Sequence, residues 1–282
     1  MPSTPNWPSF GNDDCERSRG VTEIGIHGRR VGFARHLVSV AGRAVRRIPR
    51  EPESVLPAIV VPVFFYAVNL GALQKIAQHV TPFDFKSFLL PGAIVFAVTG
   101  VSRASTLVTD IERGYFDRLM LTPVPRLALL LGLMAADFLL VVALTIPVLV
   151  MGFIVGVRFA TGPAGVLVFI LMSAMWGLAF TGFLYAIALK TGNPAAVNAA
   201  FVVFFPFAFL TTAFVPQVAL SSWMSTVADY NPVTYLLAGL RSLESPGWQG
   251  SQLWPCFAAI VCVFVISMSL ALWALHGRTS AG

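Results

Sequence analysis

The stretch that decides the fold class is Phe159–Leu189, FATGPAGVLVFILMSAMWGLAFTGFLYAIAL, in which 31 consecutive residues carry no charged side chain. About 20 apolar residues, rising about 1.5 Å each, are enough to cross the roughly 30 Å of hydrocarbon in a bilayer. Four more uncharged stretches occur elsewhere: Val55–Leu73, Phe138–Val157, Thr191–Ala228 and Pro255–Leu275. A water-soluble core does not need such stretches repeatedly, so the pattern predicts a membrane protein.

The composition of the whole chain supports this prediction. Of the 282 residues, 56% are hydrophobic and 11% are charged, whereas soluble domains carry about 25% charged residues. The formal net charge is +6, and in so apolar a chain it indicates anionic lipid rather than nucleic acid as the partner. Cys15, Cys256 and Cys262 are scattered and lack a Cys/His cluster, so no metal site is predicted.

We predict an all-α membrane protein with six transmembrane helices. The expected spans are about 54–74, 87–109, 127–156, 164–189, 195–215 and 254–275, with ends that are accurate to a few residues. On this count 15 of the 19 basic residues, nine of them before the first span, fall on one side of the membrane. Because short cytoplasmic loops are enriched in Lys and Arg, both termini are expected in the cytoplasm and the protein in the inner cell membrane.

The chain before the first span divides into two segments, and the transmembrane domain follows as residues 51–282. Residues 1–30 are rich in Pro, Ser, Asn, Asp and Gly, a composition typical of a disordered tail. Within residues 31–50, Phe33, Leu37 and Val40 share one helical face that arginines flank. This arrangement favours an amphipathic helix on the inner membrane surface, and the alternative is an ordinary basic linker.

A charged loop joins the second and third spans on the predicted cytoplasmic side. Residues 110–126, DIERGYFDRLMLTPVPR, hold three acidic and three basic side chains. Gly114 can end one helix, Tyr115–Leu121 can form a short second one, and the prolines of Thr122–Pro125 then force an extended break. A short mixed-charge helix parallel to the membrane is suited to docking on a cytosolic protein, and the alternative is a solvated loop.

The segments Glu112–Leu119 (ERGYFDRL) and Thr122–Arg126 (TPVPR) resemble the cytoplasmic signature of type-2 ATP-binding-cassette (ABC) export permeases, especially the daunorubicin-resistance class. Further pieces agree in order and spacing. They are Ala135–Asp137 (AAD) in the third span, Gly156–Phe159 (GVRF) at its end, Asn231–Tyr235 (NPVTY) in the last external loop, and Leu240 with Arg241 after it. The resemblance covers about residues 30–276 and leaves out residues 1–30.

The resemblance implies the membrane subunit of an exporter of hydrophobic drugs or lipid-like molecules. The chain holds no P-loop sequence, so ATP and Mg²⁺ would bind to a separate ABC ATPase present in two copies. A second permease, identical or paralogous, would complete the transporter. Residues 31–50 would form its connecting helix, and residues 216–250 short re-entrant helices before the last span. The coupling helix would be about 112–120, with these ATPase-docking residues: Glu112, Arg113, Tyr115, Phe116 and Arg118.

One acidic residue, Asp137, lies about ten residues into the third span. Inserting an ionised carboxylate at such a depth costs about 3 kcal/mol or more, so its side chain is expected to face protein or water. Arg103, near the inner end of the second span, is the expected partner. The favoured interpretation is a structural charge pair between two spans, and the alternative is an acid on the transport path or in a proton relay.

Phenylalanines are concentrated in the fifth span. An aromatic wall suits flat, hydrophobic substrates, but contact with lipid or neighbouring helices explains the same residues. The candidate substrate-path residues are Phe201, Phe205, Phe209 and Thr211.

Three other functions compete with an ATP-driven exporter. An ion-coupled secondary transporter would need several intramembrane charges or inverted repeats, and the sequence shows one acid and no repeat. A membrane-embedded transferase would need a catalytic constellation near an interface, and none is present. The third alternative is a structural membrane subunit without transport activity. We therefore expect no catalytic residues and no cofactor held by this chain.

Overall fold

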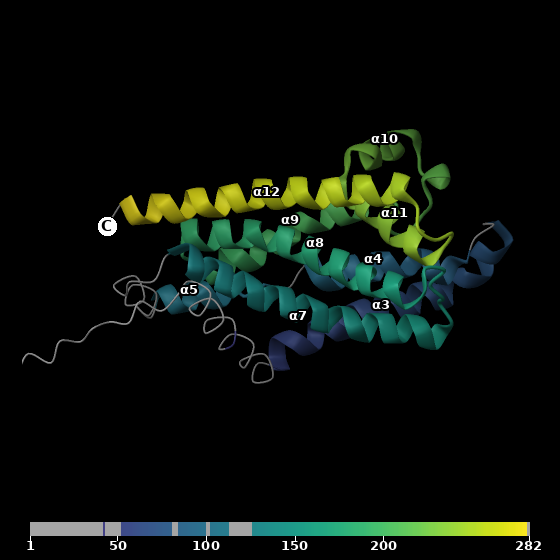
Figure 1. Ribbon diagram of the computed structural model, residues 1–282, viewed down its shortest axis with the longest axis horizontal. Coiled ribbons are helices and arrows are strands. Elements are labelled where there is room, and N and C mark those ends of the chain that lie inside the picture. Colours follow the sequence, from purple (N-terminus) through teal and green to yellow (C-terminus); the bar gives the residue numbers. More distant parts are fainter. Residues whose placement is uncertain (1–41, 43–51, 81–83, 100–101, 113–125, 281–282) are drawn as a thin grey trace, which may run out of the picture. The chain divides into compact units, whose positions relative to one another are not determined.

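The computed structural model describes residue 42 and residues 52–80, 84–99, 102–112 and 126–280, and every regular element among them is helical. All of these residues belong to one compact unit (Figure 1). The elements are α3 (Pro52–Val80), α4 (Phe85–Thr99), α5 (Ala104–Glu112), α7 (Arg126–Val155), α8 (Gly162–Thr191), α9 (Pro194–Phe209), the 3₁₀ turn η3 (Gln217–Ala219), α10 (Ser222–Tyr230), α11 (Pro232–Glu244) and α12 (Gly250–Ser280). Apart from Gly42, the expected amphipathic helix lies outside the described residues, as do residues 113–125.

Five segments of the described chain are long and apolar enough to cross a membrane. They are Leu56–Lys75, Phe85–Thr109, Leu130–Val155, Gly162–Thr191 and Gly250–Gly277. The remaining expected span, about 195–215, contains α9, which has 16 residues. A helix of that length rises about 24 Å, less than the roughly 30 Å of a hydrocarbon core. The fold is therefore that of a multi-pass membrane protein with five candidate spanning segments in its described part.

The second expected span is not one uninterrupted helix. α4 ends at Thr99 and α5 begins at Ala104, with Ser102 and Arg103 in non-helical conformation between them. Hydropathy averaged over a window does not detect so short an interruption, because the flanking residues are apolar enough to mask it. Non-helical backbone within a span nevertheless needs hydrogen-bond partners in the protein, and the described structure supplies them for the amides of Arg103 and Ala104.

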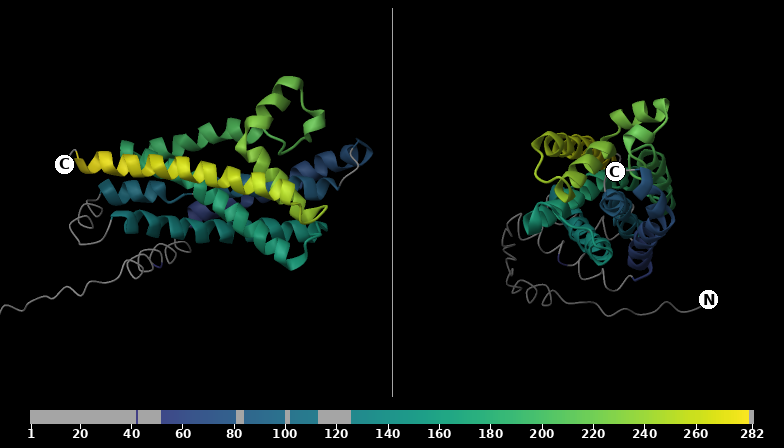
Figure 2. Two further views of the ribbon diagram at one scale, coloured as in Figure 1. Left: turned by 45° about the horizontal axis from the view of Figure 1, so that its top comes forward. Right: turned by 90° about the vertical axis from the view of Figure 1, so that its right-hand side faces the viewer.

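α8 is the central helix of the bundle. It packs against α12, α7, α4, α9 and α5, and α12 runs along its length (Figures 1 and 2). Close approach depends on small residues: a Cβ added at Gly182 would lie 2.5 Å from Ser267 Oγ and 3.0 Å from the Ser267 carbonyl carbon on α12. Small side chains bring membrane helices together because packing, rather than the hydrophobic effect, drives their association.

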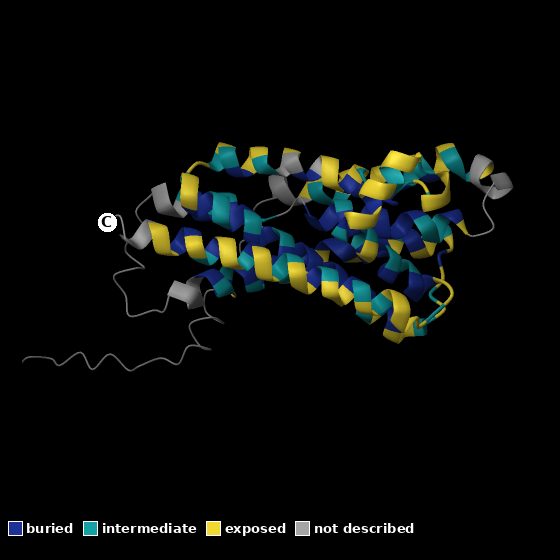
Figure 3. Cartoon of the chain, turned by 90° about the horizontal axis from the view of Figure 1, so that it is seen from above, coloured by how far each residue is buried: buried dark blue, intermediate teal, exposed yellow. Residues whose placement is uncertain are grey.

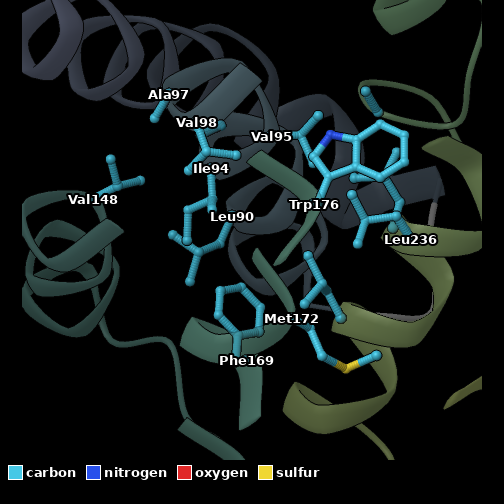
Figure 4. Close-up of a cluster of buried hydrophobic side chains, with 14 of the residues drawn as sticks. Leu90, Ile94, Val95, Ala97, Val98, Val148, Phe169, Met172, Trp176 and Leu236 are labelled. Atoms are coloured by element: carbon cyan, nitrogen blue, oxygen red, sulfur yellow. The ribbon is translucent and has the colours of Figure 1, made fainter. Parts of the chain in front are cut away.

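The buried side chains form two clusters at opposite ends of the bundle. The larger one, here the α11-side core, is centred on Leu90, Ile94, Phe169, Trp176 and Leu236, most of which point toward one another in Figure 4. The second cluster is here called the α5-side core. Its principal members are Leu107, Leu130, Leu184, Tyr185 and Ala271. The Asp137 side chain and the residues between α4 and α5 form the polar contacts described in the next subsection.

The outward faces of the helices are apolar. Leu56 and Phe64 on α3 are 63% and 61% exposed, and Trp273 on α12 is 63% exposed. Exposed positions follow the outer side of each helix, while buried ones lie between helices (Figure 3). Large apolar surfaces of this kind are unusual on a soluble monomer, and they fit contact with hydrocarbon.

Short helices follow α9, in the region where the sequence predicts them. Residues 210–216 are not helical, and η3, α10 and α11 come next. α11 packs against α12, α4 and α8, whereas α10 rests on α11 and η3. In Figure 1 α10 stands beside the end of the bundle.

Candidate functional site

The carboxylate of Asp137 joins three elements inside the bundle. It is fully buried on α7. Its Oδ1 accepts a hydrogen bond from the Arg103 backbone N–H at 3.1 Å. Its Oδ2 accepts from Tyr185 Oη on α8 at 2.7 Å and from Ser102 Oγ at 3.4 Å. Three donors offset much of the cost of burying a carboxylate in a membrane, and we call this group the Asp137 node.

The Asp137 node holds the N-terminus of α5. The Arg103 carbonyl accepts the Leu107 N–H, so Arg103 is the residue that precedes the first turn. Its own N–H has no partner within the helix and binds Asp137, while the Ala104 N–H donates to Ser102 Oγ at 3.1 Å. The first amides of a helix carry partial positive charge and are stabilised by an anion. The carboxylate of α7 therefore caps a helix that belongs to another span.

The described structure brings Arg103 and Asp137 together, but by a different bond from a simple side-chain pair. The contact uses the Arg103 backbone amide. Arg103 is only 6% exposed. Among the described residues, its Nε is buried without a hydrogen-bond partner. The guanidinium contributes favourable charge near the carboxylate without a direct hydrogen bond to it. The role of this pair is treated under the proposed function.

The end of α4 is attached to α8 by a second polar contact. Trp176 Nε1 donates to Thr99 Oγ1 at 3.1 Å, and Thr99 Oγ1 donates to the Val95 carbonyl at 2.6 Å. Both Thr99 and Trp176 are buried. The two sides of the break in the second span are thus fixed separately, α4 by Trp176 and α5 by the Asp137 node.

The predicted docking residues begin at the last residue of α5 and continue after it. Glu112 is its last residue, although its side chain lies outside the description. Arg113, Tyr115, Phe116 and Arg118 fall within residues 113–125, which the structure does not describe. The α5 backbone therefore leads from the Asp137 node to the predicted coupling segment within nine residues.

A second polar group lies near the end of α11. The Arg241 guanidinium donates from Nε to the Phe88 carbonyl on α4 at 3.1 Å and from Nη1 to Thr212 Oγ1 at 3.1 Å. Its Nη2 donates to the carbonyls of Thr212 at 2.6 Å and Ala213 at 3.4 Å. The guanidinium also lies 3.6 Å from the centre of the Phe88 ring. This group, the Arg241 clamp, joins α11, α4 and the segment after α9.

Glu244 lies one turn after Arg241 and is 3% exposed. Among the described residues, neither of its carboxylate oxygens has a hydrogen-bond partner. Burial raises the pKa of Glu244 well above its usual value, Arg241 opposes that shift, and Asp84 adds to it. Burial thus disfavours the charged form of this carboxyl group relative to an exposed glutamate.

Asn231 explains the Asn-Pro pair noted in the sequence. Its Oδ1 accepts from the Val233 N–H at 3.0 Å, which caps α11, and Pro232 takes the first helical position, where no N–H is needed. Its Nδ2 donates to the carbonyls of Phe207 at 2.7 Å and Leu210 at 3.0 Å. One side chain therefore starts α11 and satisfies the free carbonyls at the end of α9.

Of the candidate substrate-path residues, the side chains of Phe209 and Thr211 are described, and neither lines the cavity that opens on α9. Phe209 is 45% exposed, and its ring lies 5.5 Å from that of Phe96. Thr211 donates to the Ala208 carbonyl in the turn after α9. The side chains of Phe201 and Phe205 lie outside the described part. A cavity does open on α9, but Phe204 and Phe207 line it rather than Phe209 or Thr211.

Sequence reasoning missed most of the partners in the Asp137 node and in the contact between α4 and α8. Ser102, Tyr185, Thr99 and Trp176 form hydrogen bonds that depend on how the spans pack. The available signal was weak: Tyr185 is a lone tyrosine in the uncharged stretch 159–189, and buried Tyr and Trp usually need a partner. Within the described residues no group of three or more His, Cys, Asp or Glu side chains could hold a metal ion.

Comparison with known proteins identifies related chains. The family model for ABC-2 type transporters matches residues 35–245. The chain is 26% identical over 204 residues to the daunorubicin resistance ABC transporter permease protein DrrB1 of Streptomyces coeruleorubidus, covering 71% of this chain and 72% of the relative. It is 25% identical over 251 residues to the probable doxorubicin resistance ABC transporter permease protein DrrC of Mycobacterium tuberculosis, covering 86% and 91%. It is also 25% identical over 221 residues to the putative transport permease ycf38 of Cyanophora paradoxa, covering 76% and 75%.

Proposed function

The chain belongs to the ABC-2 type transporter family, and from this premise we propose that it is the permease subunit of an ATP-driven exporter of hydrophobic compounds. It is a transporter subunit and not itself an enzyme, as its relatives are permeases. A separate ABC ATPase, in two copies, binds ATP and Mg²⁺. A second copy of the chain, or a paralogue, completes the membrane part.

The proposed arrangement in the bilayer is supported by the family match and by the distribution of basic residues. The five candidate spanning segments are joined by a sixth crossing, made of α9 and the non-helical residues 210–216 after it. α10 and α11 re-enter the outer leaflet. The two termini, α5 and the coupling segment lie on the cytoplasmic side of the inner membrane, with residues 31–50 as the connecting helix along its surface.

One observation carries the mechanism: the second span is interrupted, and the polar side chains that hold its two parts are different. α4 is bound to α11 by the Arg241 clamp through the Phe88 carbonyl and to α8 through Thr99. α5 is capped by Asp137 of α7 and continues into the predicted docking residues. Motion of the ATPase would therefore reach α5 first, and α4 through the chain between the two helices and through α8 and α9, against which both pack.

The proposed cycle uses this division. ATP draws the two ATPase subunits together, and their surfaces move the coupling segments. Each α5 then moves as a short rigid helix that the Asp137 node holds at its N-terminus. The spans change between inward-facing and outward-facing arrangements. Asp137 has a structural role in this cycle, because its two oxygens are occupied by three donors. An ion-coupled mechanism is less well supported, since no second acid lies within the five candidate spans.

The experiment replaces both docking charges in the complete chain, as Glu112→Ala with Arg118→Ala. We expect loss of co-purification with the ABC ATPase and loss of ATP-driven export, with membrane insertion unchanged. The matched control is Asp110→Ala with Arg126→Ala, which removes one acid and one base from the same loop outside the docking set. Transport that is unchanged in the Glu112/Arg118 variant, or equally reduced in the control, would refute docking at this segment.

A further inference from the structure

A cavity of about 330 Å³ lies between four helices of the bundle. Its floor is α8, its two sides are α9 and α12, and Val233 at the start of α11 closes one end. α9 and α12 both pack against α8 but make little contact with each other. Phe207 at the rim is 55% exposed. The cavity therefore opens sideways, toward the hydrocarbon that surrounds the bundle.

The walls of this cavity present almost only carbon atoms. All of its lining residues have apolar or aromatic side chains, and Trp176 is the one with a polar atom. The Trp176 N–H is already bound to Thr99 Oγ1, so the indole presents its ring alone. A ligand could form no side-chain hydrogen bond here, and any charged or strongly polar part would lose its water without compensation. The cavity accepts uncharged, hydrophobic groups only.

The aromatic rings around the cavity support one another. Phe180 on α8 lies 4.9 Å from Phe204 on α9 in an edge-to-face arrangement, and 5.8 Å from Phe183. Phe204 in turn lies 6.4 Å from Phe96 on α4. Such contacts add to the burial of each ring and hold the wall in place. A flat molecule finds complementary ring faces and edges there.

The start of α11, which closes the cavity, is attached to the end of α9. Asn231 binds the carbonyls of Phe207 and Leu210 and caps α11. Pro232 and Val233, the next two residues, line the cavity, as does Phe207. Movement of α11 relative to α9 would therefore change the shape of the closed end of the cavity. A ligand bound in the cavity would in turn affect α11 and the segment after α9, which the Arg241 clamp joins.

We propose that this cavity is the lateral entry site for the exported cargo, and that it takes uncharged polycyclic hydrophobic molecules from the bilayer. The cavity is large enough to hold such a molecule in part, since ligand pockets begin at about 300 Å³. The inference rests on the proposed export function and specifies its substrate class. The ring-lined wall favours a rigid polycyclic cargo over a flexible lipid tail.

The test uses contact quenching of Trp176 in the full-length chain. Trp7, Trp223, Trp248, Trp254 and Trp273 are replaced by Phe, which leaves Trp176 as the only tryptophan. The chain is placed in nanodiscs of dioleoylphosphatidylcholine, and dibromocholesterol, an uncharged polycyclic quencher, is titrated into the bilayer. We expect quenching that saturates. In nanodiscs of dibromo-phosphatidylcholine we expect unbrominated cholesterol to restore the Trp176 fluorescence, because it displaces the lipid tail.

Cavity-filling variants make the result specific. Ala200→Phe on α9 and Val263→Phe on α12 fill the cavity from opposite sides. Each should raise the quencher concentration needed for half-maximal quenching by at least about fivefold, because an added ring occupies much of a pocket near the lower size limit. Ala199→Phe is the matched control, because Ala199 is exposed on the same helix and lines no part of the cavity. Size-exclusion profiles identify any variant that does not fold, and the two fillings provide independent readings.

Three results would overturn the proposal. Quenching that rises in proportion to the quencher and is equal in Ala200→Phe and Ala199→Phe would mean bulk contact with the bilayer. Failure of cholesterol to relieve quenching by the brominated lipid would mean a resident acyl chain. Absence of quenching by both probes would mean that the cavity is covered, for example by a second copy. The assay needs no ATPase, so it can fail while the docking experiment succeeds, and the reverse.

Discussion

Asp137 on the α5 side and Arg241 on the α11 side both connect three elements, but they do so with different partners. Asp137 accepts from two hydroxyls and one backbone amide at the start of a helix. Arg241 donates to three carbonyls and a hydroxyl and stacks on Phe88. A planar guanidinium with several fixed acceptors has one geometry, whereas a carboxylate facing a helix end tolerates rotation of that helix. In the proposed mechanism, the α11 side is therefore the fixed end and the α5 side is the end where movement begins.

The largest effect is expected when the carboxylate of the Asp137 node is removed. Asp137→Leu leaves the Arg103 amide and the hydroxyls of Ser102 and Tyr185 buried without their acceptor, which should lower the free energy of unfolding by about 3 kcal/mol. Tyr185→Phe removes one donor and should cost about 1 kcal/mol. Thermal unfolding in detergent measures both. Equal stability of Asp137→Leu and the unmodified chain would show that the node does not hold α5.

The Arg241 clamp should be less sensitive to loss of charge than to loss of shape. Arg241→Lys keeps the charge but cannot reach the Phe88 carbonyl and Thr212 together, so we expect a loss of about 2 kcal/mol in unfolding free energy. The exposed Arg158 on the loop after α7 offers a control, because Arg158→Lys should have little effect. If Arg241→Lys is as stable as Arg158→Lys, charge alone explains the site and the fixed-end interpretation is wrong.

Packing against α12 can be tested at both ends of the bundle with one type of substitution. A Cβ at Gly182 would clash with Ser267 on α12, and one at Gly239 of α11 would clash with Cys256. Each Gly→Ala change should cost about 1–2 kcal/mol through overpacking. Gly71→Ala on α3 is the control, because no atom lies within 4 Å of the added Cβ. Melting temperatures that rise at Gly182 or Gly239 would contradict the close approach of the helices.

The smallest effect concerns pH. Burial raises the pKa of Glu244 well above its usual value in the folded state, so the folded protein binds this proton more tightly than the unfolded chain does. The resulting stabilisation is complete below the unfolded pKa and is lost as the pH rises toward the folded one. As the pH rises above the usual glutamate pKa of about 4.3, the melting temperature should therefore fall less in Glu244→Gln than in the unmodified chain. Asp229→Asn, at an exposed acid on α10, should leave the slope unchanged. A steeper slope in Glu244→Gln would refute the raised pKa.

Much of the fold could be predicted because membrane insertion depends on properties that add along the chain. The uncharged stretch Phe159–Leu189 lies almost entirely within α8, and the Asn-Pro pair at Asn231 lies where α11 begins. The resemblance to ABC export permeases agrees with the family model. The predicted docking segment stays a prediction in both position and role, since residues 113–125 lie outside the described structure.

The candidate sites were harder to predict because their partners are far apart in the chain. Asp137 could be recognised as costly to bury, and Arg103 as its neighbour, but the sequence could not show that the bond uses a backbone amide. That amide is free only because the second span is interrupted. Likewise, Phe204 and Phe207 differ from Phe209 only in the direction in which they leave α9, and this direction decides which of them line the cavity.

The sequence by itself determined that this chain is helical, crosses a membrane several times and belongs among ABC export permeases, because hydropathy, charge bias and local motifs are read residue by residue. Only the tertiary structure decided where the second span breaks, which donors reach Asp137, which carbonyls hold Arg241 and where the bundle leaves a hydrophobic cavity. In a bilayer every helix satisfies its own backbone, so the chain specifies its spans locally. The remaining polar groups and ring faces depend on helix rotation and close approach, which only packing fixes.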